Sequence, residues 1–506
     1  MKNYILVGLA CLSLSCNQLP DQNTSGGHSL VELKARGDGY ISTNARAFLL
    51  TGTVHTRLDD NAMMLSGSDR DAAVAKAVKR RMSTLSRAVK KHLDRVLSDA
   101  GNGLTGEKAQ YFTYFRSAGR DQSHTLKESA DGTLSIDFEL EFVGSVHLMS
   151  LVSPGASTYR TFEVTLNDWS GQTADETVTV RVQGSPTKDA FPKYDALFAD
   201  GVLDIGIHFG GDYNEGRHDI ETAKWLVDLL IEDAWVNDSV KSFDDLKIDS
   251  PPFTRTLTIE GREMVVEITV THSDMVDETE EYKLSDAIKV SLAEKDIVMY
   301  SGHAGENAGF IMDYQPRHEI KASEFAEIPM ADKYQIYILD GCRTYRTYVD
   351  DIMKNPAKNY DNVDIVTTVN TTPFAVGYQM LYQFVYWLTL TNDDGAHFPL
   401  SWKAILRGVN TRSFKTVHYG VHGVANNPQL NPHRSQGIAC TPCSADNECG
   451  AGGNLCLGYP AGNACGVACT HDAACDPGYR CARLVDDPKL FYIPKQCVRR
   501  DYACAP

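Results

Sequence analysis

The sequence predicts an α/β protein built on a mainly parallel β-sheet with helices on both faces, preceded by an N-terminal α+β domain and followed by a C-terminal disulfide-rich module. Three observations support this prediction. Between residues 200 and 410, apolar runs of strand length alternate with amphipathic helical segments, which is typical of βαβ units. Before residue 190, strand candidates with two-residue alternation follow one long helical pattern. After residue 436, cysteines separated by Gly, Asn, Asp and Pro replace the apolar runs.

Composition narrows the classes of partner. The chain has 506 residues, of which 42% are hydrophobic and 23% are charged, as in ordinary globular proteins with room for about three domains. The formal net charge of −17 argues against nucleic acid and anionic lipid as main partners, because both would be repelled. We therefore expect no nucleic-acid partner.

The N-terminus has the pattern of an export signal. A short basic start precedes the apolar stretch Tyr4–Leu14, which is too short to span a bilayer. The segment Ser13–Cys16 resembles a bacterial lipoprotein cleavage site, and plain signal-peptidase cleavage nearby is the alternative. We expect residues 1–16 to be a signal peptide of lipoprotein type, lipidated at Cys16, and residues 17–39 to be a polar linker. The protein is then an outer-membrane lipoprotein, a cell-surface protein or a secreted protein, and touches a membrane only through this anchor.

Residues 40–190 predict an α+β accessory domain or pro-domain. Apolar residues three and four apart predict a long helix over Asp69–Ala100. Its other face is basic. A helix that lies on a membrane surface or binds a partner is one explanation, and the solvated face of a packed helix is the simpler one. The strands alternate polar and apolar residues and predict an antiparallel sheet with one wet face; they are expected at Ala47–Val54, Leu134–Val143, Val146–Val152, Thr161–Leu166 and Thr177–Val182.

Residues 191–435 predict the mainly parallel sheet, because strand and helix patterns alternate there. A hairpin is expected around Glu260-Gly261. The expected strands are Val202–Phe209, Leu257–Ile259, Met264–Thr271, Ile297–Tyr300, Tyr334–Leu339 and Val363–Val369. The expected helices are Ile220–Ala234, Leu284–Ala293, Val349–Asn355, Gly377–Leu390 and Trp402–Gly408.

Residues 436–506 predict a module held by disulfides, because such a segment cannot bury a sizeable core and the chain is exported. Zinc is the rival explanation of Cys440 and Cys443, but no second Cys-x-x-Cys pair follows. His418, His422 and His433 do not predict a metal site either, because glycines interrupt a helix there. We therefore expect no metal and no cofactor. The cysteines expected in five disulfides are Cys440, Cys443, Cys449, Cys456, Cys465, Cys469, Cys475, Cys481, Cys497 and Cys504.

The candidate catalytic residues lie at two strand ends. Outside the signal segment and the cysteine-rich module, Cys342 is the single cysteine of the sequence. It follows the apolar run of one strand, and His303 follows the apolar run of another. Open α/β sheets keep their chemistry at the carboxyl ends of their strands. A thiol and an imidazole at two such ends are what a cysteine nucleophile and its base require.

The motifs Ser301-Gly302-His303 and Asp340-Gly341-Cys342, each after an apolar strand, resemble those of the caspase-like fold, shared by caspases, gingipains and legumains. The resemblance covers residues 200–430. It implies a cysteine endopeptidase acting on a peptide or protein substrate. In that fold, Cys342 would attack the peptide carbonyl and His303 would protonate the leaving amine.

The resemblance also implies an oxyanion site formed by backbone N–H groups of Cys342, Ala304 and Gly305. The family usually has glycine directly after the histidine, whereas here Ala304 holds that position and Gly305 follows. A non-catalytic surface binding or adhesion protein on a degenerate caspase-like scaffold is therefore the alternative function.

The loop at Gly210–His218 is the expected source of substrate selectivity, because the family's P1 pocket receives residues from this loop. Asp212 would select a basic P1 side chain, and Arg217 would select an acidic one. A solvated loop charge is the simpler explanation of both residues. If one of them selects the substrate, the choice between them stays open, with a slight preference for Asp212.

Overall fold

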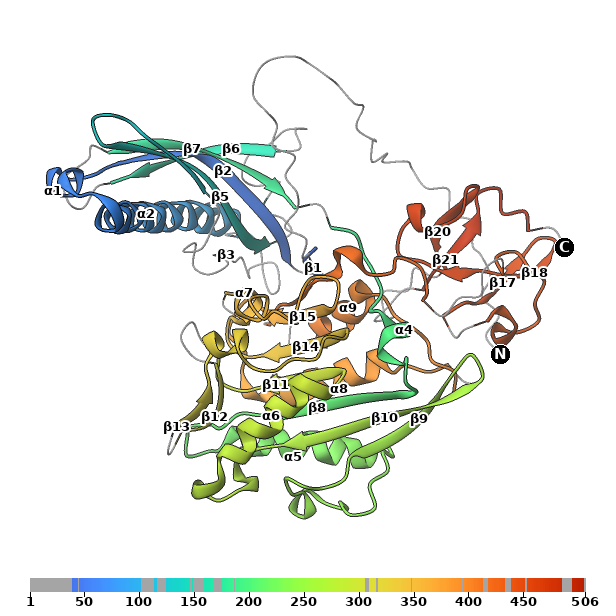
Figure 1. Ribbon diagram of the computed structural model, residues 1–506. Helices are drawn as coiled ribbons and strands as arrows, with labels where there is room; N and C mark the ends of the chain where they lie inside the picture. Colours follow the sequence, from blue (N-terminus) through green and yellow to red (C-terminus); the bar gives the residue numbers. More distant parts are fainter. Residues whose placement is uncertain are drawn as a thin grey trace.

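The protein has a central α/β domain between two smaller parts, as Figure 1 shows. The computed structural model describes residues 39–43, 45–101, 113–115, 124–145, 148, 159–167, 175–185, 187–304, 309–314, 317–346, 348–392, 395–412, 417–432, 438–450, 453–484 and 494–504. The expected signal peptide, Cys16, nearly all of the linker, and Gly305 lie outside these ranges.

The central sheet has eight strands in the order β1-β16-β15-β14-β11-β8-β10-β9. The five inner strands β15, β14, β11, β8 and β10 are parallel, whereas β1, β16 and β9 pair antiparallel with their neighbours. The mainly parallel sheet is therefore confirmed. Its strands are β1 (Ile41–Ser42), β8 (Val202–Phe209), β9 (Phe253–Ile259), β10 (Arg262–Thr271), β11 (Ile297–Ser301), β14 (Gln335–Asp340), β15 (Val363–Thr368) and β16 (Tyr419–His422).

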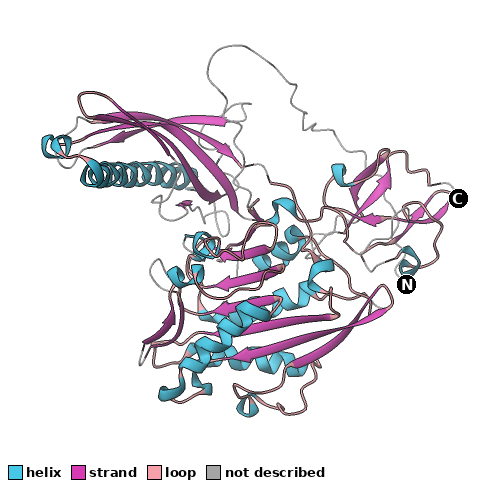
Figure 2. Cartoon of the chain, viewed as in Figure 1, coloured by secondary structure: helices cyan, strands magenta, loops and turns pink. Residues whose placement is uncertain are grey.

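Helices cover both faces of this sheet, as Figure 2 shows. One face bears α5 (His218–Glu232), α8 (Phe374–Leu388) and α9 (Trp402–Arg412). The other bears α6 (Tyr282–Glu294) and α7 (Tyr348–Ile352). Because both faces are covered, strands such as β11 and β14 are buried along their whole length.

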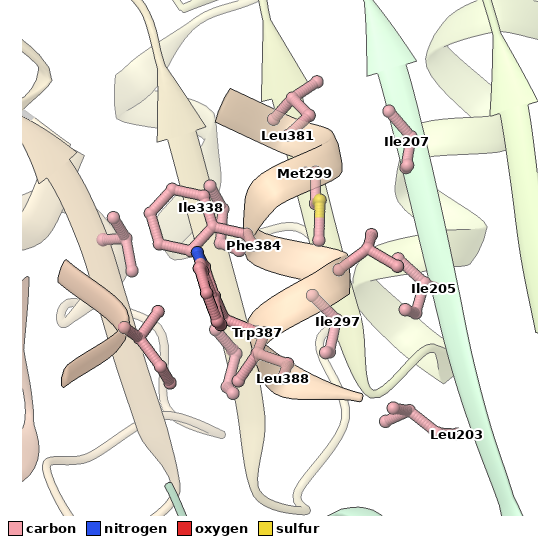
Figure 3. Close-up of a cluster of buried hydrophobic side chains, with 14 of the residues drawn as sticks. Leu203, Ile205, Ile207, Ile297, Met299, Ile338, Leu381, Phe384, Trp387 and Leu388 are labelled. Atoms are coloured by element: carbon pink, nitrogen blue, oxygen red, sulfur yellow. The ribbon is translucent and has the colours of Figure 1, made fainter. Parts of the chain in front are cut away.

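Successive residues of one strand supply two different cores. Met299 of β11 packs in the core under α8, whereas the adjacent Tyr300 packs in the core under α6. Figure 3 shows Phe384, Trp387 and Leu388 of α8 over the side chains of β8, β11 and β14. The unbroken apolar runs in the sequence are thus the signature of strands covered on two sides.

Further short elements complete the domain. The hairpin of β12 (Phe310–Tyr314) and β13 (Arg317–Ile320) was not among the predicted strands, nor was β16. The helix α4 (Tyr194–Leu197) leads into β8. The 3₁₀ turns here are η3 (Phe243–Asp245), η4 (Ser273–Met275), η5 (Glu278–Glu280), η6 (Ala322–Ala326), η7 (Thr344–Arg346) and η8 (Val424–Asn426).

The N-terminal domain is an antiparallel sheet with a long helix on one face, as predicted. The helix α2 (Gly67–Gly101) buries Val78, Met82, Leu85, Val89 and Leu93 against the sheet. The strand expected at 146–152 lies outside the described residues except for Leu148. The other elements are β2 (Ala45–Arg57), α1 (Asp60–Met64), β3 (Thr113–Phe115), β4 (His124–Glu128), β5 (Thr133–Ser145), β6 (Tyr159–Leu166) and β7 (Glu176–Gly184).

The first described strand does not belong to this N-terminal sheet. β1 pairs with β16 of the central sheet, and the N-terminal sheet begins only at β2. A two-residue strand has no periodicity that could reveal its partner, so the sequence could not place this boundary.

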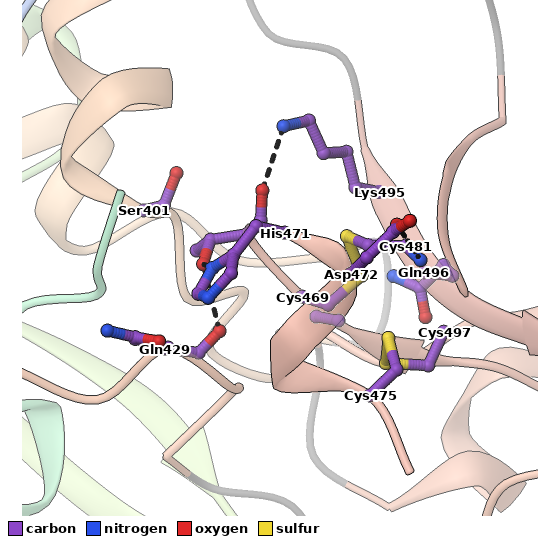
Figure 4. The surroundings of a disulfide bond; sticks show 12 residues. Ser401, Gln429, Cys469, His471, Asp472, Cys475, Cys481, Lys495, Gln496 and Cys497 are labelled. Carbon is purple, nitrogen blue, oxygen red and sulfur yellow. Dashed lines mark hydrogen bonds between the residues drawn. A yellow bond between two sulfur atoms is a disulfide. The ribbon is translucent and has the colours of Figure 1, made fainter. Parts of the chain in front are cut away.

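The ten cysteines predicted to be bonded form five disulfides in the C-terminal module, with a pairing that the sequence left open: Cys440–Cys504, Cys443–Cys456, Cys449–Cys465, Cys469–Cys481 and Cys475–Cys497. It consists of two similar units. In each unit the first cysteine pairs with the third and the second with the fourth. In each, an aspartate, Asp446 or Asp472, accepts a hydrogen bond from the backbone N–H of the third cysteine. Figure 4 shows the second unit.

The module's short elements surround these bridges. Its strands are β17 (Cys456–Tyr459), β18 (Gly462–Cys465), β19 (Val467–Ala468), β20 (Tyr479–Arg483) and β21 (Lys495–Arg499), with 3₁₀ turns η9 (Asp446–Cys449) and η10 (Asp472–Ala474). So many disulfides are typical of an exported protein. Within the described part of the chain, no helix combines the length and hydropathy of a bilayer-spanning segment.

The close approach of α8 to the sheet edge gives a test of this fold. A Cβ atom at Gly377 would lie 2.5 Å from Ser301 Oγ and 2.7 Å from Asp340 Oδ2. We expect Gly377→Ala to lower the free energy of unfolding by about 1–2 kcal/mol, because the clash outweighs the better helix propensity of alanine. Urea denaturation measures the change. Ala375→Ser, on the exposed side of the same helix, is the control and should change it by less than about 0.5 kcal/mol. Unchanged stability in Gly377→Ala would contradict the packing.

Candidate active site

Three parallel strands bring the candidate residues to one edge of the central sheet. In the sheet register, Ser301 at the end of β11 lies opposite Phe209 of β8 and Asp340 of β14. Asp212, His303 and Cys342 follow these three strand ends within a few residues. Because parallel strands end at the same edge, all three side chains belong to one group of loops.

The loops after β11 and β14 are in direct contact. Gly302 N–H donates to the Asp340 carbonyl at 3.1 Å. A Cβ atom at Gly341 would lie only 2.6 Å from the Ala304 methyl group. Glycine is therefore needed immediately before Cys342, because Ala304 occupies the space that a side chain would take.

His303 is held by a buried carboxylate. Its Nε2 lies 3.0 Å from Asp212 Oδ1, and the Asp212 side chain is fully buried. Oδ1 also accepts from the backbone and side-chain N–H groups of Asn214, and Oδ2 accepts from His218 N–H. Burial acts to raise the pKa of Asp212, but hydrogen bonds from His303 and Asn214 outweigh it and lower the pKa below its usual value. Asp212 is therefore an ionised partner of the imidazole.

Three aromatic rings surround the imidazole of His303. Tyr213 stacks on it with ring centroids 4.8 Å apart, while Phe374 and Tyr314 meet it edge-on at 5.0 and 5.4 Å. The rings come from the loop after β8, the start of α8 and β12. Packing and the Asp212 bond together fix the ring orientation, and Nδ1 is the ring nitrogen that Asp212 does not engage.

Cys342 is the free cysteine of the described residues, and it is partly exposed. Its Sγ lies 3.9 Å from the carbonyl oxygen of Thr372. The next residue, Arg343, has a positive φ of 58° and donates its N–H to the Asn370 carbonyl. Backbone contacts to the segment after β15 thus shape the turn that presents the thiol.

A second buried carboxylate lies beneath the Cys342 loop. Asp340 accepts hydrogen bonds from Ser301 Oγ and Tyr419 Oη, each at 2.7 Å. Burial raises its pKa to about 6, although these two hydrogen bonds act in the opposite direction. In the sequence, Asp340 is distinguished only as an aspartate at the end of an otherwise apolar strand, and no role of its own was predicted for it.

The two residues expected to select the substrate are engaged elsewhere. Asp212 has no exposed side-chain surface and serves His303. Arg217 forms a bidentate pair with Asp219 and also bonds Ser273 and Asp274. Hydrogen bonding to Asp219 is the main cause that raises the pKa of Arg217 above its ordinary value. Its guanidinium is therefore committed to contacts at the N-terminus of α5.

Two of the three residues expected to form the oxyanion site lie within the described residues. Cys342 and Ala304 lie at the two adjoining loops, as expected, whereas Gly305 lies outside the described residues. The aromatic rings of Tyr314 and Phe374 were not predicted, because they reach His303 from distant parts of the sequence. Tyr213 could have been predicted more easily than the other two rings, because it directly follows Asp212 in the sequence.

Comparison with known proteins adds no relative. No protein-family model, curated protein or solved structure matches the chain. The chemistry of the site must therefore be inferred from its own residues. A thiol and an imidazole that follow neighbouring strand ends, with the imidazole held by an ionised carboxylate, are the groups that a sulfur nucleophile and its base require.

Asp340 predicts a pH dependence of stability. Its pKa of about 6 in the folded protein exceeds the unfolded value of about 3.9. The folded state therefore binds the proton more tightly, and the stability from this group is lost as the pH rises through about 6. Between pH 7.5 and pH 5, we expect wild type to gain about 1 kcal/mol relative to Asp340→Asn, as measured by urea denaturation. A difference between the two proteins that does not change with pH would contradict this assignment.

Proposed function

We propose that the protein is an exported cysteine endopeptidase of caspase-like fold, in which Cys342, His303 and Asp212 form the catalytic group. The observation that supports this most strongly is the bond between His303 Nε2 and the buried Asp212, at the sheet edge where the free Cys342 also lies. The mainly parallel sheet with helices on both faces fits the fold that the sequence motifs resemble.

The proposed reaction uses the thiol as a covalent nucleophile. His303 removes the Cys342 thiol proton, and the sulfur attacks the peptide carbonyl carbon to form a C–S bond. His303 then gives the proton to the departing amine as the C–N bond breaks. Water, deprotonated by His303, attacks the thioester, releasing the carboxylic acid and restoring the thiol.

Two further groups support this reaction in the proposal. Asp212 stabilises the imidazolium and fixes the ring nitrogen that faces the thiol. The backbone N–H groups of Cys342 and Ala304 are the described donors for the oxyanion. Asp212 and Arg217 are bound within the protein, so we propose that Asp212 acts through His303 and not on the P1 side chain.

Export and anchoring complete the proposed function. The five disulfides indicate an oxidising compartment, and the N-terminal sequence supplies the signal for reaching it. We propose lipidation at Cys16, which would hold the enzyme at the outer membrane or cell surface.

The nucleophile is tested by labelling with iodoacetamide and by peptide cleavage. We expect Cys342→Ala to abolish both labelling and cleavage, because every other cysteine among the described residues is in a disulfide. Labelling of Cys342→Ala at the wild-type level would contradict the assignment of Cys342 as the nucleophile. Labelling without cleavage of any peptide in a library would favour the non-catalytic binding protein.

The proton-transfer residues are tested by single-turnover cleavage rates. We expect His303→Ala to slow cleavage by about 10²–10⁴-fold and Asp212→Asn by at least about tenfold, because the ring loses its orientation. His218→Ala is the matched control in the same loop. Its side chain is largely exposed and pairs with Glu221, so its rate should stay near that of wild type. Circular dichroism verifies that each variant is folded.

A further inference from the structure

The N-terminal sheet has an edge strand that lies beside a groove. β6 pairs with β7 on one side and is the last strand of the order β3-β5-β2-β7-β6. Along β6, Phe162, Val164 and Leu166 are buried toward α2, while Glu163 and Thr165 are exposed. The part of this strand that lines the groove, residues 163–166, presents backbone N–H and C=O groups that can pair with another chain.

The groove between α2 and this edge has a volume of about 950 Å³, enough for several residues of an extended peptide. Apolar atoms of Ala88, Val164 and Leu166 contribute to its lining, and basic side chains of α2 form its other wall. The lining residues are Thr84, Arg87, Ala88, Lys91, His92, Arg95, Glu163, Val164, Thr165, Leu166 and Asn167.

Among the described residues, the basic side chains of the groove lack the carboxylate partners that two other arginines of α2 have. Arg70 pairs with Glu128 and Arg81 with Glu176. Arg87, Lys91 and Arg95 are exposed and have no carboxylate partner among the residues that the structure describes. Glu163 is the single carboxylate in the lining. In a chain of net charge −17, this groove is a local excess of positive charge.

The spacing of the three cations matches that of a β-strand. Arg87, Lys91 and Arg95 are four residues apart, which separates them by about 6 Å along the helix. Residues on one face of a strand repeat every two positions, about 6.7 Å. An extended peptide with acidic residues at alternate positions could therefore present successive carboxylates to successive cations.

We propose that the groove between α2 and β6 binds an extended acidic segment of a partner protein. The segment pairs with the β6 edge as an added strand and places alternate carboxylates against Arg87, Lys91 and Arg95. This inference is independent of the peptidase activity, because it concerns the N-terminal domain and uses none of the catalytic residues.

Binding of a defined peptide to the full-length protein tests this. The probe is a fluorescein-labelled peptide of four Glu-Val repeats, measured by fluorescence anisotropy at 50 mM and 150 mM salt. We expect saturable binding that weakens with salt, because exposed charge pairs are screened. A Lys-Val peptide of the same length should not bind. Failure of the Glu-Val peptide to bind at either salt concentration would overturn the proposal.

Matched variants locate the binding. Combined Arg87→Glu, Lys91→Glu and Arg95→Glu substitutions should weaken the Glu-Val peptide about tenfold or more, because attraction becomes repulsion. The control combines Lys76→Glu, Lys79→Glu and Arg80→Glu, which make the same change in charge on the same helix outside the groove lining. It should weaken binding less than about twofold. Equal losses in both proteins would show non-specific attraction and refute the site.

Two more measurements test the mode of binding and the class of partner. A Glu-Val peptide N-methylated at every residue has no backbone N–H to donate to a strand edge, and it should lose most of its affinity. Undiminished binding would refute strand addition. Vesicles containing anionic lipid test the membrane alternative. Groove substitutions that weaken vesicle binding and leave peptide binding unchanged would show a membrane surface in place of a protein partner.

Discussion

The end of β11 is the constraint on which the candidate site depends, because it bonds to the strands on both sides. The Ser301 carbonyl accepts from Gly210 N–H after β8, and Gly302 N–H donates to the Asp340 carbonyl at the end of β14. The Ser301 hydroxyl also donates to the Asp340 carboxylate. These bonds extend the parallel ladder beyond the strands, so the three loops that carry Asp212, His303 and Cys342 start from fixed positions.

The two buried carboxylates near this edge have opposite pKa shifts for one physical reason. Burial acts to raise the pKa of both. Asp212 accepts from several N–H groups, including an imidazole that can carry positive charge, and these donors stabilise its ionised form. Asp340 accepts only from two neutral hydroxyl groups among the described residues, which compensate less for burial. Asp212 therefore carries a negative charge beside His303, whereas Asp340 contributes mainly to the structural framework.

Both flanking parts contact the central domain, and the N-terminal domain does so beside the candidate site. Tyr345, three residues after Cys342, donates its hydroxyl hydrogen to Glu141 of the N-terminal sheet at 3.3 Å. It also belongs to a small buried cluster with Tyr40, Ala45, Ala47, Val143 and Val369. On the other side, Thr470 of the disulfide module contacts the backbone carbonyls of Asp189 and Gln429. The N-terminal domain therefore packs against the segment that follows the candidate nucleophile.

The sequence by itself determined the parallel sheet, the long helix of the N-terminal domain, the disulfide-bonded cysteines, and the strand ends that carry His303 and Cys342. Short stretches of the sequence encode these features through their periodicity, apolar runs and residue types. Only the tertiary structure decided that Asp212 bonds His303, that Arg217 is committed to Asp219, that Tyr314 and Phe374 pack around the imidazole, and that β1 joins the central sheet. Which polar group meets which depends on strand register and loop path, and these are set by contacts between residues far apart in the chain.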